Sequence, residues 1–123
     1  MRVMLSIKPE FVNQIILGNK KYEYRKKIFK KNVDTVVIYA TKPIGKLIGE
    51  FKISKILKDT PNNIWNETHK YSGITEDFFM NYFCNTDSAF ALQIENFYEY
   101  DTPIDPYMVN KNFYPPQSYM YIE

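Results

Sequence analysis

Hydrophobic and polar residues alternate along several stretches of this chain, and alternation with period two predicts β-strands that bury one face. Residues 2–7 follow this pattern first, with Val3, Leu5 and Ile7 on one side. The stretch 33–41 is almost continuously apolar and rich in β-branched residues, which strands favour. Further strands are predicted over residues 20–28, 47–54, 89–100 and 119–122.

Helical spacing replaces the alternation in three places. Pro9 suits the first turn of a helix, because its missing N–H would have no partner there, and the apolar residues that follow form one stripe. This helix is predicted over residues 9–17 and can end at Gly18 in a left-handed conformation. Residues 59–63, which contain a proline and two asparagines, are predicted to break the pattern. Two more helices are predicted over residues 65–71 and 75–83.

This order of elements predicts an α+β protein that is mainly β. Several short strands with one buried face favour a small closed or nearly closed barrel of five or six strands, which would also leave no unpaired strand edges. The first helix would lie against one opening of this barrel, and the later helices would form an insertion. A length of 123 residues fits one domain, residues 1–123, with a core of its own.

Composition excludes several classes of protein. Hydrophobic residues make up 45% of the chain and aromatic residues 17%, so the chain is expected to fold. No apolar run is long enough to span a bilayer, and the first residues lack the pattern of a secretory signal peptide. A single cysteine, Cys84, and a single histidine, His69, leave no disulfide framework and no zinc site. We expect a cytoplasmic protein without metal, cofactor or membrane contact.

Charge is distributed unevenly, although the net charge is only +2. Residues 1–58 carry 14 Lys and Arg against four acids, a net +10, whereas residues 59–123 carry two Lys against ten acids, a net −8. A basic half of this kind is typical of proteins with a polyanionic partner, and nucleic acid is the partner that we expect. The alternative is that folding interleaves the two halves and evens out the field.

One acid, Glu23, lies inside the most basic stretch of the chain, residues 17–31. On a strand, Glu23 and Arg25 lie about 6.5–7 Å apart on one face, so with Lys20 they could line a cleft of nucleotide size. A carboxylate accepts hydrogen bonds from the exocyclic amines of cytosine and adenine, while arginine donates to carbonyls and phosphates. The alternative is an internal salt bridge that holds the helix end against the sheet.

Other residues near this stretch could complete a binding site. Ser6 and Lys8 are expected at the rim of the cleft, because the first strand ends there and the helix returns the chain to Gly18. Two roles are open to the lysines of this stretch: they could contact phosphates without recognising a sequence, or they could form a solvated turn. These lysines are Lys26, Lys27, Lys30 and Lys31. The candidates for stacking on a base are Tyr22, Tyr24 and Tyr39.

Residues 18–25, Gly-Asn-Lys-Lys-Tyr-Glu-Tyr-Arg, match G-x-K-x-x-E-x-R, the signature of the ASCH domain family among the PUA-like barrels. The flanks resemble the same family. Residues 5–9 are similar to its strand-to-helix entry, and residues 38–43 are similar to its next strand. Residues 73–83 are similar to its helical insertion, and residues 115–119 are similar to its closing segment. The resemblance touches both ends of the chain. It implies a barrel with a nucleic-acid-binding cleft lined by the motif, with Thr41 of the next strand among the ligand-binding candidates.

Some small members of this family are amidohydrolases that deacetylate N4-acetylcytidine with a lysine, a threonine and a glutamate. In this resemblance Lys20 matches the lysine, but Glu23 stands where the threonine would be. The position that corresponds to the family's glutamate falls near Lys70 and Tyr71, and no glutamate in this part of the chain could take its role. A carboxylate can act as a base but cannot replace a hydroxyl nucleophile in the same mechanism. The departure argues against this activity.

We therefore interpret the chain as a nucleic-acid-binding module for single-stranded RNA that could read a modified or flipped base. This interpretation assigns no catalytic residue and favours a binding protein over an enzyme. The first alternative is a hydrolase, either an N4-acetylcytidine amidohydrolase or a ribonuclease, in which Lys20 and Glu23 transfer protons. The second alternative is a protein-interaction module whose basic face meets an acidic partner.

Overall fold

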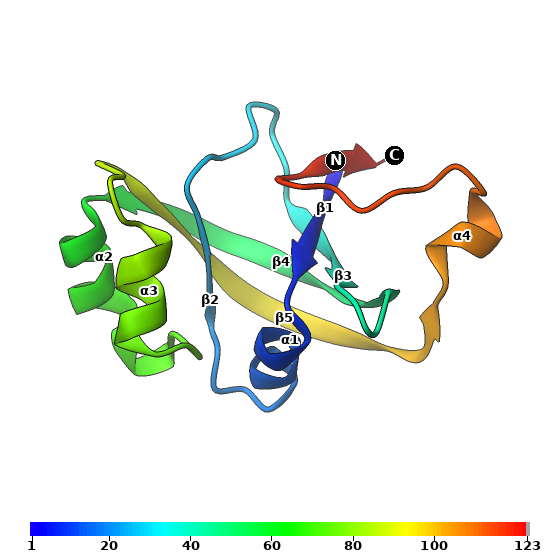
Figure 1. The fold of residues 1–123 in the computed structure, drawn as a ribbon, viewed down its shortest axis with the longest axis horizontal. Coiled ribbons are helices and arrows are strands. Elements are labelled where there is room, and N and C mark those ends of the chain that lie inside the picture. The colour runs from blue at the N-terminus through cyan, green and yellow to red at the C-terminus, as the bar shows by residue number, and fades with distance from the viewer. Residues whose placement is uncertain (123) are drawn as a thin grey trace.

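The computed structural model describes residues 1–122 and shows a curved sheet with short helices around it (Figure 1). Its strands are β1 (Arg2–Ile7), β2 (Tyr22–Arg25), β3 (Thr35–Ala40), β4 (Lys46–Asp59), β5 (Ala89–Ile104) and β6 (Met120–Ile122). Its helices are α1 (Pro9–Ile16), α2 (Pro61–Thr68), the 3-10 helix η1 (His69–Tyr71), α3 (Glu76–Tyr82) and α4 (Pro106–Val109). The predicted α+β class is confirmed.

The strands form a 6-stranded sheet in the order β2-β5-β4-β3-β1-β6. β1 and β3 are parallel, and the other neighbouring pairs are antiparallel. The predicted closure into a barrel is wrong: β2 and β6 are the two edges, and no backbone ladder joins them within residues 1–122. Both edge strands are short, and the side chain of Arg25 on β2 reaches across to the backbone of Ser6 and Ser118 instead. The sheet therefore stays open, with a gap between β2 and β1.

The first helix follows the prediction closely. α1 begins at Pro9 and ends at Ile16, and its buried residues are Val12 and Ile15. Gly18 comes next with a φ of +83°, a left-handed conformation that glycine adopts without steric cost. This turn brings the chain back along α1, and the backbone N–H of Lys20 donates to the carbonyl of Gln14. The basic stretch is thereby placed beside the end of β1.

The helical insertion between β4 and β5 begins earlier than predicted. Pro61 is the first residue of α2, and the Thr60 side chain caps this helix by accepting a hydrogen bond from the backbone N–H of Asn63. The proline and asparagines that suggested a break therefore start a helix. Thr75 caps α3 in the same way. Figure 1 shows α2 and α3 together on one side of the sheet, in green.

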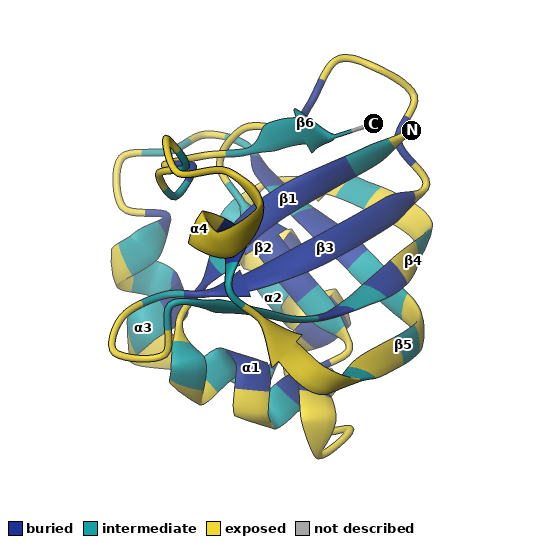
Figure 2. Ribbon diagram, turned by 90° about the vertical axis from the view of Figure 1, so that its right-hand side faces the viewer, coloured by how far each residue is buried: buried dark blue, intermediate teal, exposed yellow. Residues whose placement is uncertain are grey.

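Two apolar clusters hold these elements together. The larger cluster joins β1, β3 and α1, and it includes Val3 and Val36, which have no exposed surface. The smaller cluster joins the insertion to β2 and β5 through Tyr24, Ile64 and Phe79. Figure 2 shows β1 and β3 as largely buried strands. The elements on both sides of the gap are thus each packed into an apolar cluster.

β4 and β5 are longer than the alternation predicts. They pair with each other from Leu47 opposite Ile104 to Asp59 opposite Ala89, with several shifts of register. Many residues of β4 and β5 are exposed. Hydrophobic and polar residues therefore do not alternate near the ends of these strands, and the sequence pattern could not reveal their full lengths. Among the helices of residues 1–122, none is long and apolar enough to cross a membrane.

Candidate nucleic-acid site at the gap in the sheet

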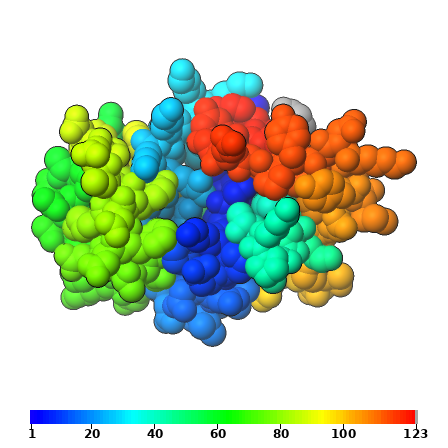
Figure 3. All heavy atoms as spheres, viewed as in Figure 1, coloured from blue at the N-terminus to red at the C-terminus, as the bar shows by residue number. Residues whose placement is uncertain are grey.

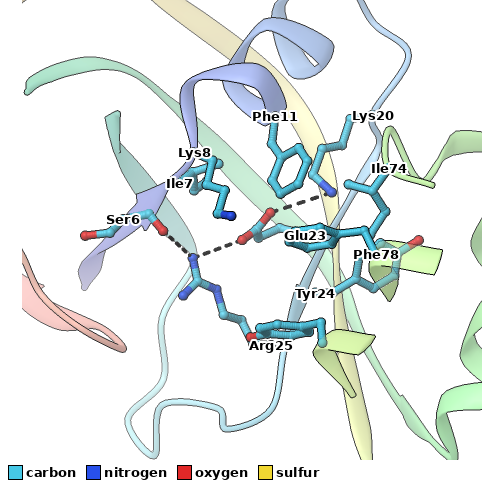
Figure 4. A pocket seen from close by; sticks show the side chains of 11 residues that line it. Ser6, Ile7, Lys8, Phe11, Lys20, Glu23, Tyr24, Arg25, Ile74 and Phe78 are labelled. Carbon is cyan, nitrogen blue, oxygen red and sulfur yellow. Dashed lines mark hydrogen bonds and ion pairs between the residues drawn. The ribbon is translucent and has the colours of Figure 1, made fainter. Parts of the chain in front are cut away.

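A pocket of about 260 Å³ opens in the gap between β1 and β2. The end of β1 and the start of α1 form one side, and the insertion forms another, as Figure 3 and Figure 4 show. The lining residues are Ser6, Ile7, Lys8, Phe11, Lys20, Glu23, Tyr24, Arg25, Ile74, Phe78 and Tyr82. Because no strand ladder closes the sheet here, side chains define the shape and the chemistry of the pocket.

Three charged side chains of the pocket form one ion cluster. Glu23 is 6% exposed, and its two carboxylate oxygens face different cations. Oε2 accepts a hydrogen bond from Arg25 Nη2 at 2.9 Å, whereas Oε1 lies 3.7 Å from Lys20 Nζ, beyond hydrogen-bond distance. Figure 4 shows the carboxylate between the two cations. The cluster therefore contains two cationic side chains for one anionic side chain.

Arg25 also connects the two sides of the gap. Its Nη2 donates to the carbonyl of Ser6 at 2.9 Å, and its Nη1 donates to the carbonyl of Ser118 at 3.3 Å. The Nε atom is buried and has no hydrogen-bond partner within residues 1–122. The internal salt bridge considered as an alternative in the sequence is therefore present. The same residues line a pocket, so a structural role and a binding role coexist at this cluster.

Lys20 is almost completely buried, with 2% of its surface exposed. Its ammonium group donates to the carbonyl of Ser72 at 2.9 Å and lies 4.8 Å from the ring centre of Tyr24. Burial lowers the pKa of Lys20 from 10.5 to about 8, a shift that Glu23 opposes and the charge of Arg25 reinforces. At pH 7 Lys20 is therefore still mostly protonated, and only a minor fraction is neutral and able to accept a proton.

Gly73 allows the insertion to approach Lys20 closely. It has a φ of +68°, and a Cβ atom added there would collide with the Cβ atom of Lys20.

We expect Gly73→Ala to lower the melting temperature more than Gly18→Ala. Both changes carry the strain of a left-handed alanine, about 1–2 kcal/mol, but a Cβ atom at Gly18 meets nothing within 4 Å. Thermal unfolding followed by circular dichroism measures the difference, and equal losses would contradict a tight contact.

Aromatic rings form another part of the pocket wall. Phe78 and Tyr82 lie one turn apart on α3 with nearly parallel rings, and Phe11 meets Phe78 edge-on. Lys8 Nζ lies 5.0 Å from the ring centre of Phe78, and Lys26 Nζ lies 4.9 Å from that of Tyr82. Flat apolar surfaces beside cations can hold a nucleobase next to a charged sugar–phosphate backbone.

The structure brings only some of the residues selected from the sequence into the pocket. Those that line it are Ser6, Lys8, Lys20, Glu23, Tyr24 and Arg25. Tyr22 packs against the apolar cluster of the insertion, and Tyr39 is buried on β3 beside Phe113. Thr41 lies in the turn after β3, where its backbone N–H donates to Ile7. These three do not line the pocket, because tertiary packing decides which way each side chain faces.

The loop between β2 and β3 carries four exposed lysines: Lys26, Lys27, Lys30 and Lys31. Among residues 1–122, none of the four is ion-paired with an acid. The backbone N–H groups of Lys30 and Lys31 donate to the hydroxyl of Tyr121, which holds this part of the loop in place. Lys26 lies over Tyr82, a residue of the pocket wall. The loop therefore presents a row of unneutralised positive charges that starts at the pocket.

Sequence reasoning missed the residues that the insertion contributes. Phe78 and Tyr82 lie four positions apart, a detectable signal that they share one face of a helix, and Ile74 precedes that helix. Nothing in the sequence connects this face to Lys20, because Ser72, which accepts the lysine hydrogen bond, is 52 residues away.

No metal site is apparent among residues 1–122, because no group of three or more His, Cys, Asp or Glu residues there could hold an ion.

Comparison with known proteins shows which family this chain resembles. A model of the ASCH domain family matches residues 5–114. The chain belongs to the ASCH domain family. An ASCH domain-containing ribonuclease from Zymomonas mobilis is 29% identical over 122 residues, covering 94% of this chain and 80% of that relative. A crystal structure of ASCH from Zymomonas mobilis, 27% identical, superposes with a TM-score of 0.91 and covers 99% of this chain and 87% of that chain.

A more distant structure resembles this ASCH domain in fold alone. The N-terminal domain of Staphylothermus marinus McrB has a TM-score of 0.55 at 13% identity, covering 91% of this chain and 80% of that chain. The open sheet with its helical insertion is therefore an ASCH architecture that also occurs, in looser form, in a protein of very different sequence. The chemistry of this ASCH domain has to be argued from its own pocket.

Proposed function

We propose that this ASCH domain binds single-stranded RNA and receives one nucleotide in the pocket at the gap. The observation that carries the proposal is the combination, in one pocket, of the Lys20–Glu23–Arg25 ion cluster and the aromatic rings of Phe11 and Phe78. Cations suit phosphate oxygens, and aromatic rings suit bases. The similarity to a ribonuclease of the same family supports RNA as the partner.

The size of the pocket supports a single nucleotide. Its volume of about 260 Å³ lies just below the range of about 300–1,000 Å³ that is usual for small-molecule sites. A base can enter only after it leaves its neighbours in the stack, which costs a few kcal/mol and least in single-stranded nucleic acid. The preference for single strands follows from this cost. The base that enters the pocket could be flipped or modified, as the sequence suggested.

The lysine row of the β2–β3 loop would supply affinity along the backbone. Two lysines of this row, Lys27 and Lys30, are expected to contact phosphates and release counterions. The variant Lys27→Ala/Lys30→Ala should bind single-stranded RNA more weakly. The slope of log affinity against log salt should become less steep by roughly 1.4, since each contact with a single strand contributes about 0.7. Fluorescence anisotropy with a labelled oligonucleotide over a series of salt concentrations measures this slope.

The matched control removes two lysines elsewhere. Lys55 on β4 and Lys111 near α4 are also exposed, and Lys55→Ala/Lys111→Ala lowers the net charge by the same amount. This control should leave the slope unchanged. Equal losses in both variants would mean that net charge, not this loop, determines affinity. Absence of any RNA binding at low salt would refute the proposed function and favour a protein partner.

A second function, RNA cleavage at the same pocket, is favoured by the lowered pKa of Lys20. In its neutral form Lys20 could accept the proton of a ribose 2′-hydroxyl while the 2′-oxygen attacks the adjoining phosphorus. The bond between phosphorus and the 5′-oxygen then breaks, and the leaving oxygen takes a proton from water. The hydroxide so formed takes up the proton that Lys20 holds, which restores neutral Lys20. The products are a 2′,3′-cyclic phosphate and a 5′-hydroxyl. Arg25 would stabilise the negative charge that develops on the phosphate oxygens.

A further inference from the structure

The ion cluster of the pocket has more hydrogen-bond donors than it uses. Lys20 has three donors, and one of them bonds to the carbonyl of Ser72. Arg25 has five donors, and three of them bond to Glu23, Ser6 and Ser118. Its Nε is buried without a partner within the described residues. A ligand that fits this cluster must therefore bring several acceptor oxygens, and a negative charge would balance the excess of cations.

One acceptor is also open in the same cluster. Glu23 Oε2 is bonded to Arg25, but Oε1 lies 3.7 Å from Lys20 Nζ and makes no hydrogen bond to it. Among the side chains that line the pocket, Glu23 is the one carboxylate. The ligand must therefore also bring one donor, placed close to its acidic oxygens. A hydroxyl group next to an anion has this arrangement.

Two hydroxyl groups of the pocket lining, those of Ser6 and Tyr24, are already engaged. The hydroxyl of Ser6 donates to the carbonyl of Pro116 at 2.7 Å. Thr68 donates its hydroxyl to Ile64, so in the 2.7 Å contact between Tyr24 and Thr68 the donor is Tyr24. Burial raises the pKa of the Tyr24 hydroxyl, which keeps this donor protonated. These two hydroxyls are therefore not available to distinguish one base from another, and the rings of Phe11 and Phe78 offer stacking.

We propose that the Lys20–Glu23–Arg25 cluster binds the ribose 2′-hydroxyl and the adjoining phosphate of one nucleotide, so that this ASCH domain selects RNA over DNA. The 2′-hydroxyl donates to Glu23 Oε1, and phosphate oxygens accept from protonated Lys20 and from Arg25. This bound arrangement differs from the cleavage step, in which neutral Lys20 would take the hydroxyl proton. The 2′-hydroxyl is the group that lets a protein distinguish RNA from DNA. This inference rests on the proposed binding of RNA in the pocket. It replaces the amine contact of Glu23 that the sequence suggested with a contact to the sugar.

The test changes the ligand first, because ligand changes cannot disturb the fold. Oligonucleotides of one sequence are compared as RNA, as DNA and as 2′-O-methyl RNA by fluorescence anisotropy at constant salt. RNA should bind about tenfold to a hundredfold more tightly than DNA, as expected for a hydrogen bond to a charged group. The 2′-O-methyl form should bind like DNA, because it has no hydroxyl proton to donate.

Two further measurements separate the possible failures. Glu23→Gln should lower the RNA-to-DNA affinity ratio, because a neutral amide oxygen accepts the hydroxyl proton more weakly than a carboxylate does, and circular dichroism verifies that the variant is folded. Inorganic phosphate should compete with RNA for the wild-type protein. Equal affinity for RNA and DNA would overturn the inference but leave RNA binding intact. Failure of both RNA and DNA to bind would overturn the proposed function as well.

Discussion

Glu23→Ala is expected to destabilise the folded protein by about 3–5 kcal/mol, the cost of removing one partner from a buried ion pair. Glu23 is 6% exposed and lies between Lys20 and Arg25, so its loss leaves two largely buried cations without their counterion. Urea unfolding at pH 7, followed by circular dichroism, measures the change in free energy. Glu67→Ala is the matched control, because Glu67 is exposed on α2, and it should change stability by less than about 0.5 kcal/mol.

A double variant tests whether the cost comes from the unbalanced charge. Lys20→Met/Glu23→Ala removes one cation together with the anion, so it leaves fewer buried charges than Glu23→Ala alone. Its loss of stability should be smaller than the sum of the two single losses, by the coupling of about 0.5–3 kcal/mol that neighbouring residues show. Additive losses would indicate that Lys20 and Glu23 do not interact. A loss below about 1 kcal/mol for Glu23→Ala would mean that the cluster is hydrated.

If RNA cleavage occurs at this pocket, Lys20→Ala should slow it by about 10²–10⁴-fold, the usual contribution of a general base. The pH dependence has a definite sign. Below a pKa of about 8, Lys20 carries a proton and cannot accept another, so the rate of cleavage should rise as the pH increases through 8 and then level off. Single-turnover cleavage of labelled single-stranded RNA between pH 6.5 and 9, at constant ionic strength, measures this profile.

The neighbouring lysine provides the control for this prediction. Lys21 is exposed, and its ammonium group lies over the ring of Tyr71 outside the pocket. Lys21→Ala removes the same charge from the next position, and it should leave both the rate and the pH profile unchanged. Cleavage that persists in Lys20→Ala would exclude Lys20 as the base. Absence of cleavage in the wild type would remove this second function and leave RNA binding to be judged by its own test.

Local patterns in the sequence determined the elements of this protein. Alternation predicted β1 over its full length, because each strand residue chooses a face by its own character. Pro9 and Gly18 marked the helix between them, since both residues act on the backbone at their own positions. Where a local signal has two meanings the prediction failed: Pro61 starts a helix, although a proline followed by asparagines also suggests a break.

The grouping of Lys20, Glu23 and Arg25 was also predictable, because the three residues lie within six positions and a strand places Glu23 and Arg25 on one face. The partners of this group were not. Ser72 and the aromatic face of α3 come from an insertion some 50 residues further along the chain, and their approach depends on Gly73. Tyr39 looked equally suitable for stacking, yet the packing of β3 buries it beside Phe113.

The open edge of the sheet was decided by the tertiary structure alone. Strand periodicity reports which face of a strand is buried, but it carries no information on whether the first and last strands of a sheet meet. Here β2 and β6 remain unpaired with each other among the described residues, and the side chain of Arg25 spans the distance. The sequence by itself determined a basic strand with one acid in it. The fold turned that strand into one side of a pocket, because the sheet stops short of closing there.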